Sequence, residues 1–266
     1  MDSDSCLLCI DSGNTNVTLG LWQEDRWKAH WRARTVRDKM PDEYAVLVRS
    51  FLDEADLDYR AISGVAISSV VPSLTLAFTE LVRRTMTLEP LVVDHRTPTG
   101  IRINIDEPQQ AGPDRLVNAA AVHALYGGPA IVIDFGTATT FDVVSADGAY
   151  CGGAIAPGIG LAHDALVEHA ARLHAVDLCP PPHAIGRNTI HAMQSGIFWG
   201  YVALVEGLVQ RLSAEMSQEQ VKIIATGGLA TVFHEHTSVI DLIAPELTLD
   251  GLRIIYELNR PNRAEP

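Results

Sequence analysis

The sequence predicts an α/β fold built from two similar halves. A buried apolar run that ends in Asp and then turns at Gly occurs twice, at Ile10-Asp11-Ser12-Gly13 and at Ile133-Asp134-Phe135-Gly136. The 123-residue spacing between Asp11 and Asp134 exceeds the period of a solenoid repeat and indicates a duplicated domain. Three early strands followed by alternating helices and strands are typical of a mixed sheet. We therefore expect two domains, over residues 1–112 and 113–266.

Apolar and alternating runs define the elements of the first half. They predict strands over Leu7–Ile10, Val17–Trp22, Trp27–Thr35, Gly64–Ser68 and Pro90–Asp94. Helices are expected from Pro41 and over Leu74–Met86, and Ser73 is placed to cap the second of these. The segment 96–113 is rich in Pro, Gly and Asn, which indicates a loop or a crossover between domains.

The second half repeats the order of the first. A helix over Arg115–Tyr126 stops at Gly127, and strands are expected from Ala130, over Thr139–Ser145 and over Tyr150–Ile155, with a hairpin turn at Asp147-Gly148. Helices over about Gly160–Leu173 and over Thr189–Leu212 are expected next, followed by a strand over Val221–Ala225, the turn Thr226-Gly227-Gly228 and a further helix. Two halves of one strand order predict a ligand cleft between them.

Composition narrows the class of protein. A hydrophobic content of 47% with 20% charged residues is ordinary for a soluble globular chain. The net charge of -13 opposes nonspecific binding to nucleic acid and to anionic membranes. The N-terminus has no basic signal-peptide start and no apolar run reaches membrane-spanning length, so we expect a cytoplasmic protein without membrane contact.

Cysteine and histidine residues do not form a predicted metal site. Cys6 and Cys9 lie three apart in a strand, facing opposite sides, and no second pair completes a zinc site. The histidines do not cluster at ligand spacing, and we expect them to be solvated (His234, His236) or on exposed helix faces (His163, His169). The signatures of a P-loop, a complete dinucleotide-binding loop, a nucleophile elbow and a zinc protease are all absent from the sequence.

The repeated Asp-x-Gly turn is the informative motif. Such a turn places a carboxylate beside backbone N–H groups that can face a phosphate. Taken alone it is more often a simple hairpin corner. Its recurrence at Asp134 and the pair Gly227-Gly228 after a third strand match the order of two phosphate loops and a nucleoside loop.

Six blocks, in order, resemble the type III pantothenate kinase family. They are Asp11-Ser12-Gly13-Asn14-Thr15, Gly112-Pro113-Asp114-Arg115, Asp134-Phe135-Gly136-Thr137, Gly152-Gly153-Ala154, Gly186-Arg187-Asn188-Thr189 and Ala225-Thr226-Gly227-Gly228. The resemblance implies two ribonuclease-H-like domains of the acetate and sugar kinase, heat-shock ATPase and actin superfamily, with the active site in the interdomain cleft. It also implies phosphorylation of pantothenate by ATP, the first step of coenzyme A biosynthesis.

The same resemblance implies a role for each matching residue. ATP and Mg²⁺ would be held by the first loop, which comprises Asp11, Ser12, Gly13, Asn14, Thr15, Asn16, Val17 and Thr18. Thr137 would contact the ATP phosphates, Gly227 and Gly228 would form the nucleoside loop, and Asp134 would bind a monovalent cation, K⁺ or NH₄⁺. Asp114 would be the proton acceptor. Pantothenate would contact Gly112, Pro113, Asp114 and Arg115, and also Thr189 from the neighbouring subunit of a homodimer.

One departure from the family pattern and two alternatives remain. Many members carry a Tyr near the position of Ile105, which cannot supply a hydroxyl to pantothenate.

One alternative is a related kinase of the same superfamily that acts on a sugar or another small hydroxylated acid. The other is a nucleotide-binding regulator that has lost catalysis. The intact carboxylates Asp11, Asp114 and Asp134 argue against this loss.

Overall fold

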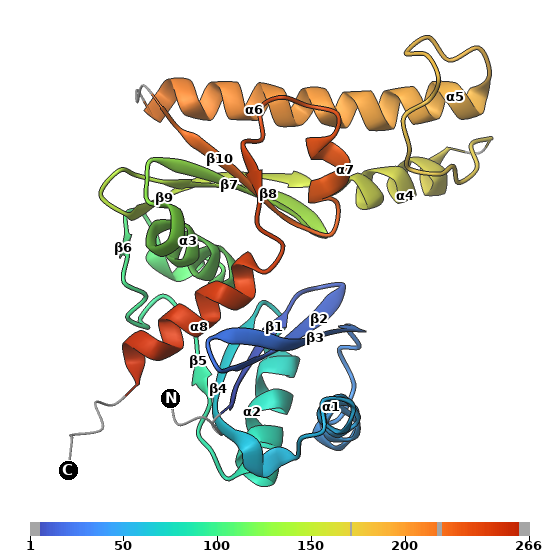
Figure 1. Cartoon of the computed structure of the whole chain (residues 1–266). Helices are drawn as coiled ribbons and strands as arrows, with labels where there is room; N and C mark the ends of the chain where they lie inside the picture. The colour runs from blue at the N-terminus through green and yellow to red at the C-terminus, as the bar shows by residue number, and fades with distance from the viewer. Residues whose placement is uncertain (1–5, 171, 217–219, 261–266) are drawn as a thin grey trace. The chain divides into compact units, whose positions relative to one another are not determined.

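The structure is a computed structural model that describes residues 6–170, 172–216 and 220–260 (Figure 1). The chain divides into two compact units, the first made of Met1–Tyr126 with Glu246–Pro266 and the second of Gly127–Pro245. The last helix that the structure describes therefore belongs to the same unit as the N-terminal strands.

The first unit contains a five-stranded sheet in the order β3-β2-β1-β4-β5. Its strands β1, β2 and β3 are antiparallel neighbours, whereas β4 and β5 run parallel to β1. The strands are β1 (Cys6–Ser12), β2 (Asn16–Gln23), β3 (Arg26–Arg34), β4 (Ile62–Ser69) and β5 (Leu91–Val92). The other elements of this unit are α1 (Pro41–Glu54), a 3₁₀ turn (Tyr59–Ala61), α2 (Pro72–Met86), β6 (Arg102–Ile103), a second 3₁₀ turn (Pro108–Gln110), α3 (Pro113–Tyr126) and α8 (Leu247–Asn259).

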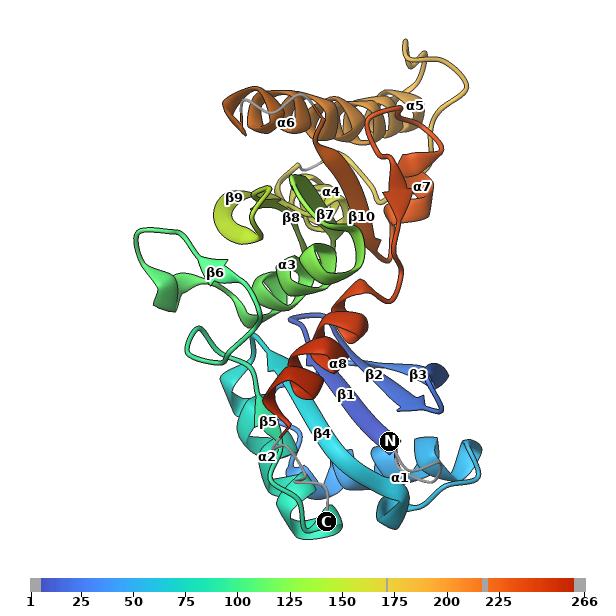
Figure 2. The same cartoon turned by 60° about the vertical axis from the view of Figure 1, so that its left-hand side comes forward.

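Each face of the first sheet is covered by a different pair of helices. On one face Leu8 and Ile10 pack with residues of α1 and α2 such as Tyr44 and Phe78. The opposite face is covered by α8, which crosses it in Figure 2, and by α3, which packs against α8 and β4. The buried residues on that face are Leu7, Cys9, Ala66, Val93, Val117, Ala120, Leu249, Leu252 and Ile255. Alternate residues of β1 therefore face different helix pairs, as the period of two of a strand requires.

The second unit repeats the strand order of the first. Its strands are β7 (Ala130–Phe135), β8 (Ala138–Val144), β9 (Ala149–Pro157), β10 (Lys222–Gly227) and β11 (Leu242–Ile243), and they lie in the order β11-β10-β7-β8-β9. The helices are α4 (Ile159–His169), α5 (Thr189–Gln194), a π-helical segment (Ser195–Trp199), α6 (Gly200–Met216) and α7 (Ala230–His234). Because β7 occupies the place of β1 and β10 that of β4, the predicted duplication is confirmed.

The chain passes from one compact unit to the other between Tyr126 and Gly127 and again between Pro245 and Glu246. The sequence placed the domain boundary between residues 112 and 113. Helix α3 packs against β4 and α8, so it joins the first unit and not the second. The start of the duplicated domain at residue 113 stays a prediction from the sequence.

Three local expectations are wrong. The second helix starts at Pro72 with Val71 as its N-cap, so Ser73 lies inside the helix and donates its hydroxyl hydrogen to the carbonyl of Arg37. Helix α4 ends at His169 and does not reach Leu173. The expected single helix from Thr189 contains a π-helical segment at Ser195–Trp199 and continues to Met216. Helix ends depend on tertiary contacts that a sequence pattern does not contain.

The continuous helical stretch Thr189–Met216 is long and apolar enough to cross a membrane by length and composition, contrary to the sequence expectation. Much of its apolar surface is used inside the second unit, because Phe198, Tyr201, Val205 and Val209 pack on the sheet. A core helix that packs on a sheet passes the same length test, so this stretch is weak evidence for a membrane span.

Candidate functional site

The first Asp-x-Gly turn is a tight hairpin between β1 and β2. The N–H of Gly13 donates to the carbonyl of Asn16 at 2.9 Å, which closes the turn. The hydroxyl of Thr35 donates to the carbonyl of Gly13 at 2.7 Å, and Arg37 donates to Oδ1 of Asn14 at 3.0 Å. The end of β3 and the segment after it therefore hold the loop in place while Asn14 and Thr15 stay exposed.

Asp11 lies in a row of polar side chains that crosses four neighbouring strands. Its cross-strand partners are Thr18 on β2 and Ser68 on β4, and Thr18 is paired in turn with Arg32 on β3. Partners in register point to the same face of a sheet. Cys9 and Ala66, two residues before Asp11 and Ser68, face α3 and α8. The row therefore continues the α3/α8 face beyond its apolar part.

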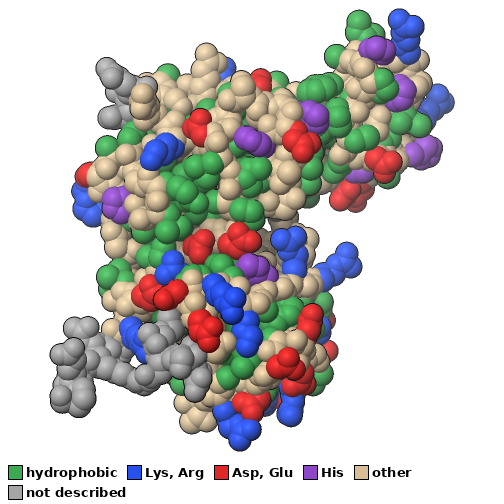
Figure 3. Space-filling model, in the orientation of Figure 1, with side chains coloured by type: hydrophobic (Ala, Val, Ile, Leu, Met, Phe, Trp, Pro, Cys, Tyr) green, Lys and Arg blue, Asp and Glu red, His purple; other side chains and the backbone are tan. Residues whose placement is uncertain are grey.

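Positive charge accompanies this row on the edge strand β3. Arg32 and Arg34 are exposed, and among the residues that the structure describes neither side chain has a hydrogen bond or an ion pair. Figure 3 shows Lys and Arg side chains grouped on the surface of the first unit over β2 and β3. In a chain of net charge -13, these guanidinium groups supply local positive charge that favours an anionic ligand.

Ser12 differs from its neighbour Asp11. Its hydroxyl is fully buried on the α1/α2 face and has no hydrogen-bond partner among the described residues. Its carbonyl accepts from the N–H of Val70 at 3.1 Å. The side chain of Ser12 therefore lies on the face opposite to the carboxylate of Asp11.

The Gly112-Pro113-Asp114-Arg115 block forms the start of α3. The N–H of Arg115 donates to Oδ1 of Asp114 at 2.9 Å and also lies 3.1 Å from the carbonyl of Gly112. A Cβ at position 112 would lie 2.5 Å from Oδ1 of Asp114, so glycine is needed for this carboxylate orientation. Burial raises the pKa of Asp114 above its ordinary value, and the N–H and guanidinium of Arg115 oppose this rise only in part. The carboxylate is thus a stronger base than an exposed one.

The second Asp-x-Gly turn, in the second unit, is also closed by the N–H of its glycine but is one residue shorter than the first. The N–H of Gly136 donates to the carbonyl of Ala138 at 3.1 Å between β7 and β8. Gly136 and Thr137 are exposed at its tip, and Asp134 is half-buried at the end of β7. Gly227 stands beside it at the end of β10, where its φ is +87° and an added Cβ would lie 2.6 Å from Oδ1 of Asp134. The structure therefore brings the second turn and the glycine pair together.

Thr189 lies on the rim of an apolar cavity of about 710 Å³ in the second unit. It is the exposed first residue of α5, whose N-cap is Asn188, with Oδ1 accepting from the N–H of His191 at 2.8 Å. The walls of the cavity come from α4, the loop after it, α5 and the helix that follows, and include Ile159, Ala162, Leu166, Leu173, Met193, Ile197 and Leu204. Apart from the hydroxyls of Thr189 and Tyr201, the side chains that line this cavity are apolar.

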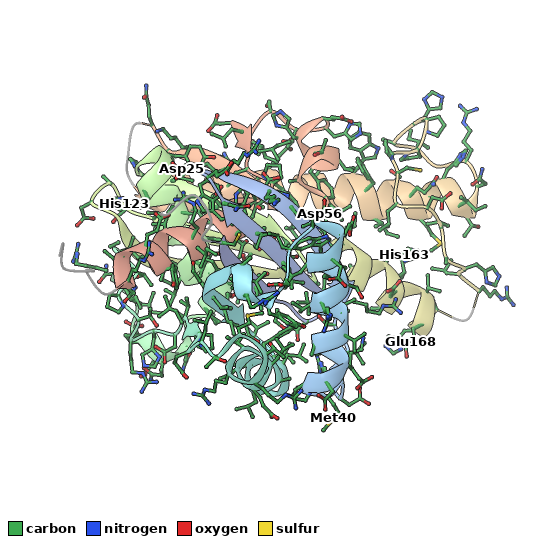
Figure 4. The ribbon with its side chains drawn as sticks, turned by 60° about the horizontal axis from the view of Figure 1, so that its bottom comes forward. Asp25, Met40, Asp56, His123, His163 and Glu168 are labelled. Atoms are coloured by element: carbon green, nitrogen blue, oxygen red, sulfur yellow. The ribbon has the colours of Figure 1, made fainter. Side chains whose placement is uncertain are left out.

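Among the histidines, His163 is not exposed as expected. Figure 4 shows it on α4, the helix that also carries Glu168. Its Nε2 accepts from the N–H of Val176 at 3.1 Å and its Nδ1 lies 3.0 Å from Oδ1 of Asp164. His163 therefore holds the loop after α4 against this helix. His169 and His234 are exposed, as expected, whereas His236 is half-buried.

The cysteines of β1 and the possible metal ligands bear on two further expectations from the sequence. Cys6 and Cys9 are fully buried in β1, and burial raises the pKa of the Cys9 thiol, which keeps it protonated. A protonated buried thiol is a poor nucleophile, in agreement with the expected core role. Within the described ranges, no group of three or more His, Cys, Asp or Glu side chains could hold a metal ion.

Sequence reasoning missed two members of the polar row, Arg32 and Ser68. Alternation along β3 identified Arg32 only as part of a solvent face. The ladder has a register shift between Leu21 and Trp22, so the face of each β3 residue follows from the pairing and not from a count along the strand. Ser68 gave no signal of its own, since a serine at a strand end is common.

The family comparison and the comparison with known sequences indicate the same family. The family described as type III pantothenate kinase matches residues 7–211. A type III pantothenate kinase of Roseiflexus sp. (strain RS-1) is 53% identical over 96% of this chain and 99% of its own. One of Moorella thermoacetica is 48% identical over 95% of this chain and 99% of its own. Among solved structures, the inorganic polyphosphate/ATP-glucomannokinase of Arthrobacter sp. strain KM shares the fold, with a TM-score of 0.52 at 16% identity, covering 96% of this chain and 100% of its own.

Proposed function

The chain belongs to the type III pantothenate kinase family, and from this membership we propose how its residues catalyse the ATP-dependent phosphorylation of pantothenate. The activity is the first step of coenzyme A biosynthesis. The fold is that of the ribonuclease-H-like kinases, which the shared fold with a sugar kinase supports. The mechanism is supported above all by the carboxylate of Asp114, which is half-buried. Burial raises the pKa of this carboxylate.

Asp114 is the proton acceptor of the proposed reaction. Phosphoryl transfer requires in-line positioning, cations that offset phosphate charge and a carboxylate near the acceptor hydroxyl. Asp114 would take the proton from the primary hydroxyl of pantothenate as its oxygen attacks the γ-phosphorus of ATP and ADP leaves. Its raised pKa makes this transfer more favourable than it is for an ordinary carboxylate. Arg115 would bind the pantothenate carboxylate through two parallel hydrogen bonds.

The first loop and its row fit the phosphates of ATP and their Mg²⁺. Mg²⁺ is usually held by one or two protein carboxylates together with substrate phosphates and water, so Asp11 alone is a sufficient protein ligand. Main-chain N–H groups of the loop through Thr18 would donate to phosphate oxygens, as would Asn14 and Thr15. The unpaired Arg32 adds charge of the right sign. In the second unit Thr137 would contact the phosphates, and Gly227 and Gly228 the nucleoside.

A coupled assay with ATP, Mg²⁺, K⁺ and pantothenate tests this function. ADP release should depend on pantothenate and should not occur with sugars or other small hydroxylated acids in its place. Folded protein that turns over a sugar, but not pantothenate, would favour the related-kinase alternative. Folded protein that binds ATP and turns over neither would favour the regulator, which the identity to named kinases disfavours.

Asp134 is proposed as the ligand of a monovalent cation, K⁺ or NH₄⁺. Its carboxylate is half-buried at the end of β7, beside the backbone of Gly227. We expect K⁺ to stimulate the wild-type rate and Asp134→Asn to remove that stimulation, as measured by titrating K⁺ at constant ionic strength. Asp147→Asn, in the β8–β9 hairpin, is the matched control and should keep the response. An unchanged K⁺ response in Asp134→Asn would refute the assignment.

The cavity beside Thr189 is proposed as part of a homodimer interface. Besides its apolar lining, exposed Leu161, Leu166 and Ile190 lie on α4 and α5 around it, and such patches mark interaction sites. We expect Leu166→Glu to give monomers in sedimentation or light scattering and to raise KM for pantothenate, because Thr189 would then be missing from the partner's site. Leu76 on α2 is also apolar and is more exposed than Leu166, so Leu76→Glu is the control and should remain dimeric. A wild-type monomer with full activity would contradict the proposal.

The expected place of this activity is the cytoplasm, where ATP and K⁺ are abundant. The family is one of metabolic enzymes, which supports this expectation. Nucleic acid and membranes are not proposed as partners.

A further inference from the structure

Ser68 is the buried polar side chain nearest to Asp11 in the sheet register. The two residues are paired across the parallel strands β1 and β4, so their side chains point to the same face of the sheet, and neighbouring strands lie about 5 Å apart. Two residues earlier, Cys9 and Ala66 are paired on the same face and pack together against α3 and α8. The pairing therefore fixes the side of the sheet on which the Ser68 hydroxyl lies.

The hydroxyl of Ser68 has no hydrogen-bond partner among the described residues, although the side chain is fully buried. A buried hydroxyl that makes no hydrogen bond destabilises the folded state, because it has lost its bonds to water. Unpaired buried polar groups in native proteins call for an explanation, of which a functional role is one. Neighbouring serines differ, since Ser63 bonds the carbonyl of Cys6 and Ser69 bonds the backbone of Val71.

The two neighbours of Ser68 across the sheet differ as acceptors for this hydroxyl. On one side the row is continued by Val93, the residue after β5, which is apolar and whose N–H already donates to the carbonyl of Ile67. On the other side stands Asp11, an acceptor with two oxygens and about four lone-pair sites. A hydrogen bond to this carboxylate would satisfy the Ser68 hydroxyl.

We propose that Ser68 is a positioning residue for Asp11. Its hydroxyl donates to one carboxylate oxygen when nucleotide and Mg²⁺ are bound, which leaves the other oxygen directed at the metal. An outer hydrogen bond of this kind orients a ligating carboxylate and commonly affects metal affinity about 10- to 100-fold. The inference rests on the proposed role of Asp11 in holding Mg²⁺ and the ATP phosphates.

Ser68→Ala tests the proposal through two thermal-stability measurements. Without ligand, the variant should be at least as stable as wild type, because an unpaired hydroxyl has been removed. With Mg²⁺ and ATP, the gain in Tm should be smaller than for wild type, since that gain reflects affinity for the native state. The Mg²⁺ concentration for half-maximal activity should rise about 10-fold or more, while KM for pantothenate stays constant.

Two further variants complete the test. Ser68→Thr retains a hydroxyl and should restore the Mg²⁺ response, whereas Ser63→Ala removes a hydroxyl at the other end of β4 and should leave it unchanged. A Ser68→Ala protein with reduced ligand-free stability and a wild-type Mg²⁺ response would show a merely structural role and overturn the proposal. Wild-type protein that gains no stability from Mg²⁺ and ATP would instead refute the proposed function itself.

Discussion

Asp114→Asn should lower kcat by about 10²- to 10⁴-fold, the usual contribution of a general base, while the gain in Tm from Mg²⁺ and ATP remains. Asparagine has nearly the same shape and its Oδ1 can accept the N–H of Arg115, but it cannot take a proton. Stopped assays over long times, together with thermal shifts with and without nucleotide, measure both effects. Near-normal turnover in Asp114→Asn would show that another group accepts the proton.

The same substitution should make the ligand-free protein more stable at neutral pH. Because burial raises the pKa of Asp114 in the folded state, its stabilising contribution is complete where it is protonated, below its unfolded pKa, and is lost as the pH rises through the folded value. Asparagine has no charge to bury. The excess Tm of the variant should therefore shrink as the pH falls towards the ordinary Asp range, and the acid limb of wild-type activity should lie above that range.

Gly227→Ala should produce the second large effect. The residue has φ of +87°, and an added Cβ would lie 2.6–2.7 Å from Oδ1 of Asp134 and from the backbone of Phe135. A side chain in this backbone region costs about 1–3 kcal/mol, and the new methyl group also displaces the carboxylate. We expect a fall in Tm of several degrees and a loss of K⁺ stimulation, with turnover reduced about 10²-fold, as a displacement of about 1 Å can cause.

Gly160→Ala is the control for this substitution. Position 160 lies in α4, where an added Cβ would have no neighbouring atom within 4 Å and φ is not positive, so alanine should stabilise the helix by about 0.5–1 kcal/mol. Opposite signs for the two substitutions are expected in thermal unfolding. If Gly227→Ala kept the wild-type Tm and K⁺ response, the contact with Asp134 would be irrelevant to the site.

Much of the fold could be predicted because short-range patterns in the sequence determine it. The apolar runs around Leu8 and Val132 identify the central strands, and the recurrence of Asp-x-Gly identifies the duplication. His163 shows the limit of such patterns. Its partner, the N–H of Val176, is thirteen residues away in a loop of irregular structure, and no periodicity in the sequence links the two.

The candidate site likewise contains residues that the sequence could predict and residues that it could not. Asp11, Asp114 and Asp134 stand in recognisable sequence motifs, and their proposed roles follow from those motifs. Arg32 and Ser68 stand in none. Their place beside Asp11 depends on the register of three strand pairs, and register is a property of the assembled sheet.

The position of α8 has a consequence for the order in which the protein is made. Helix α8 (Leu247–Asn259) leaves the ribosome long after β1 and β4, yet its residues Leu249, Leu252 and Ile255 cover the face of these strands that carries Leu7 and Ala66. A nascent chain that ends before Leu247 exposes this face. The strand that carries Asp11 is thus synthesised well before α8, and it acquires its full hydrophobic cover only after α8 has emerged.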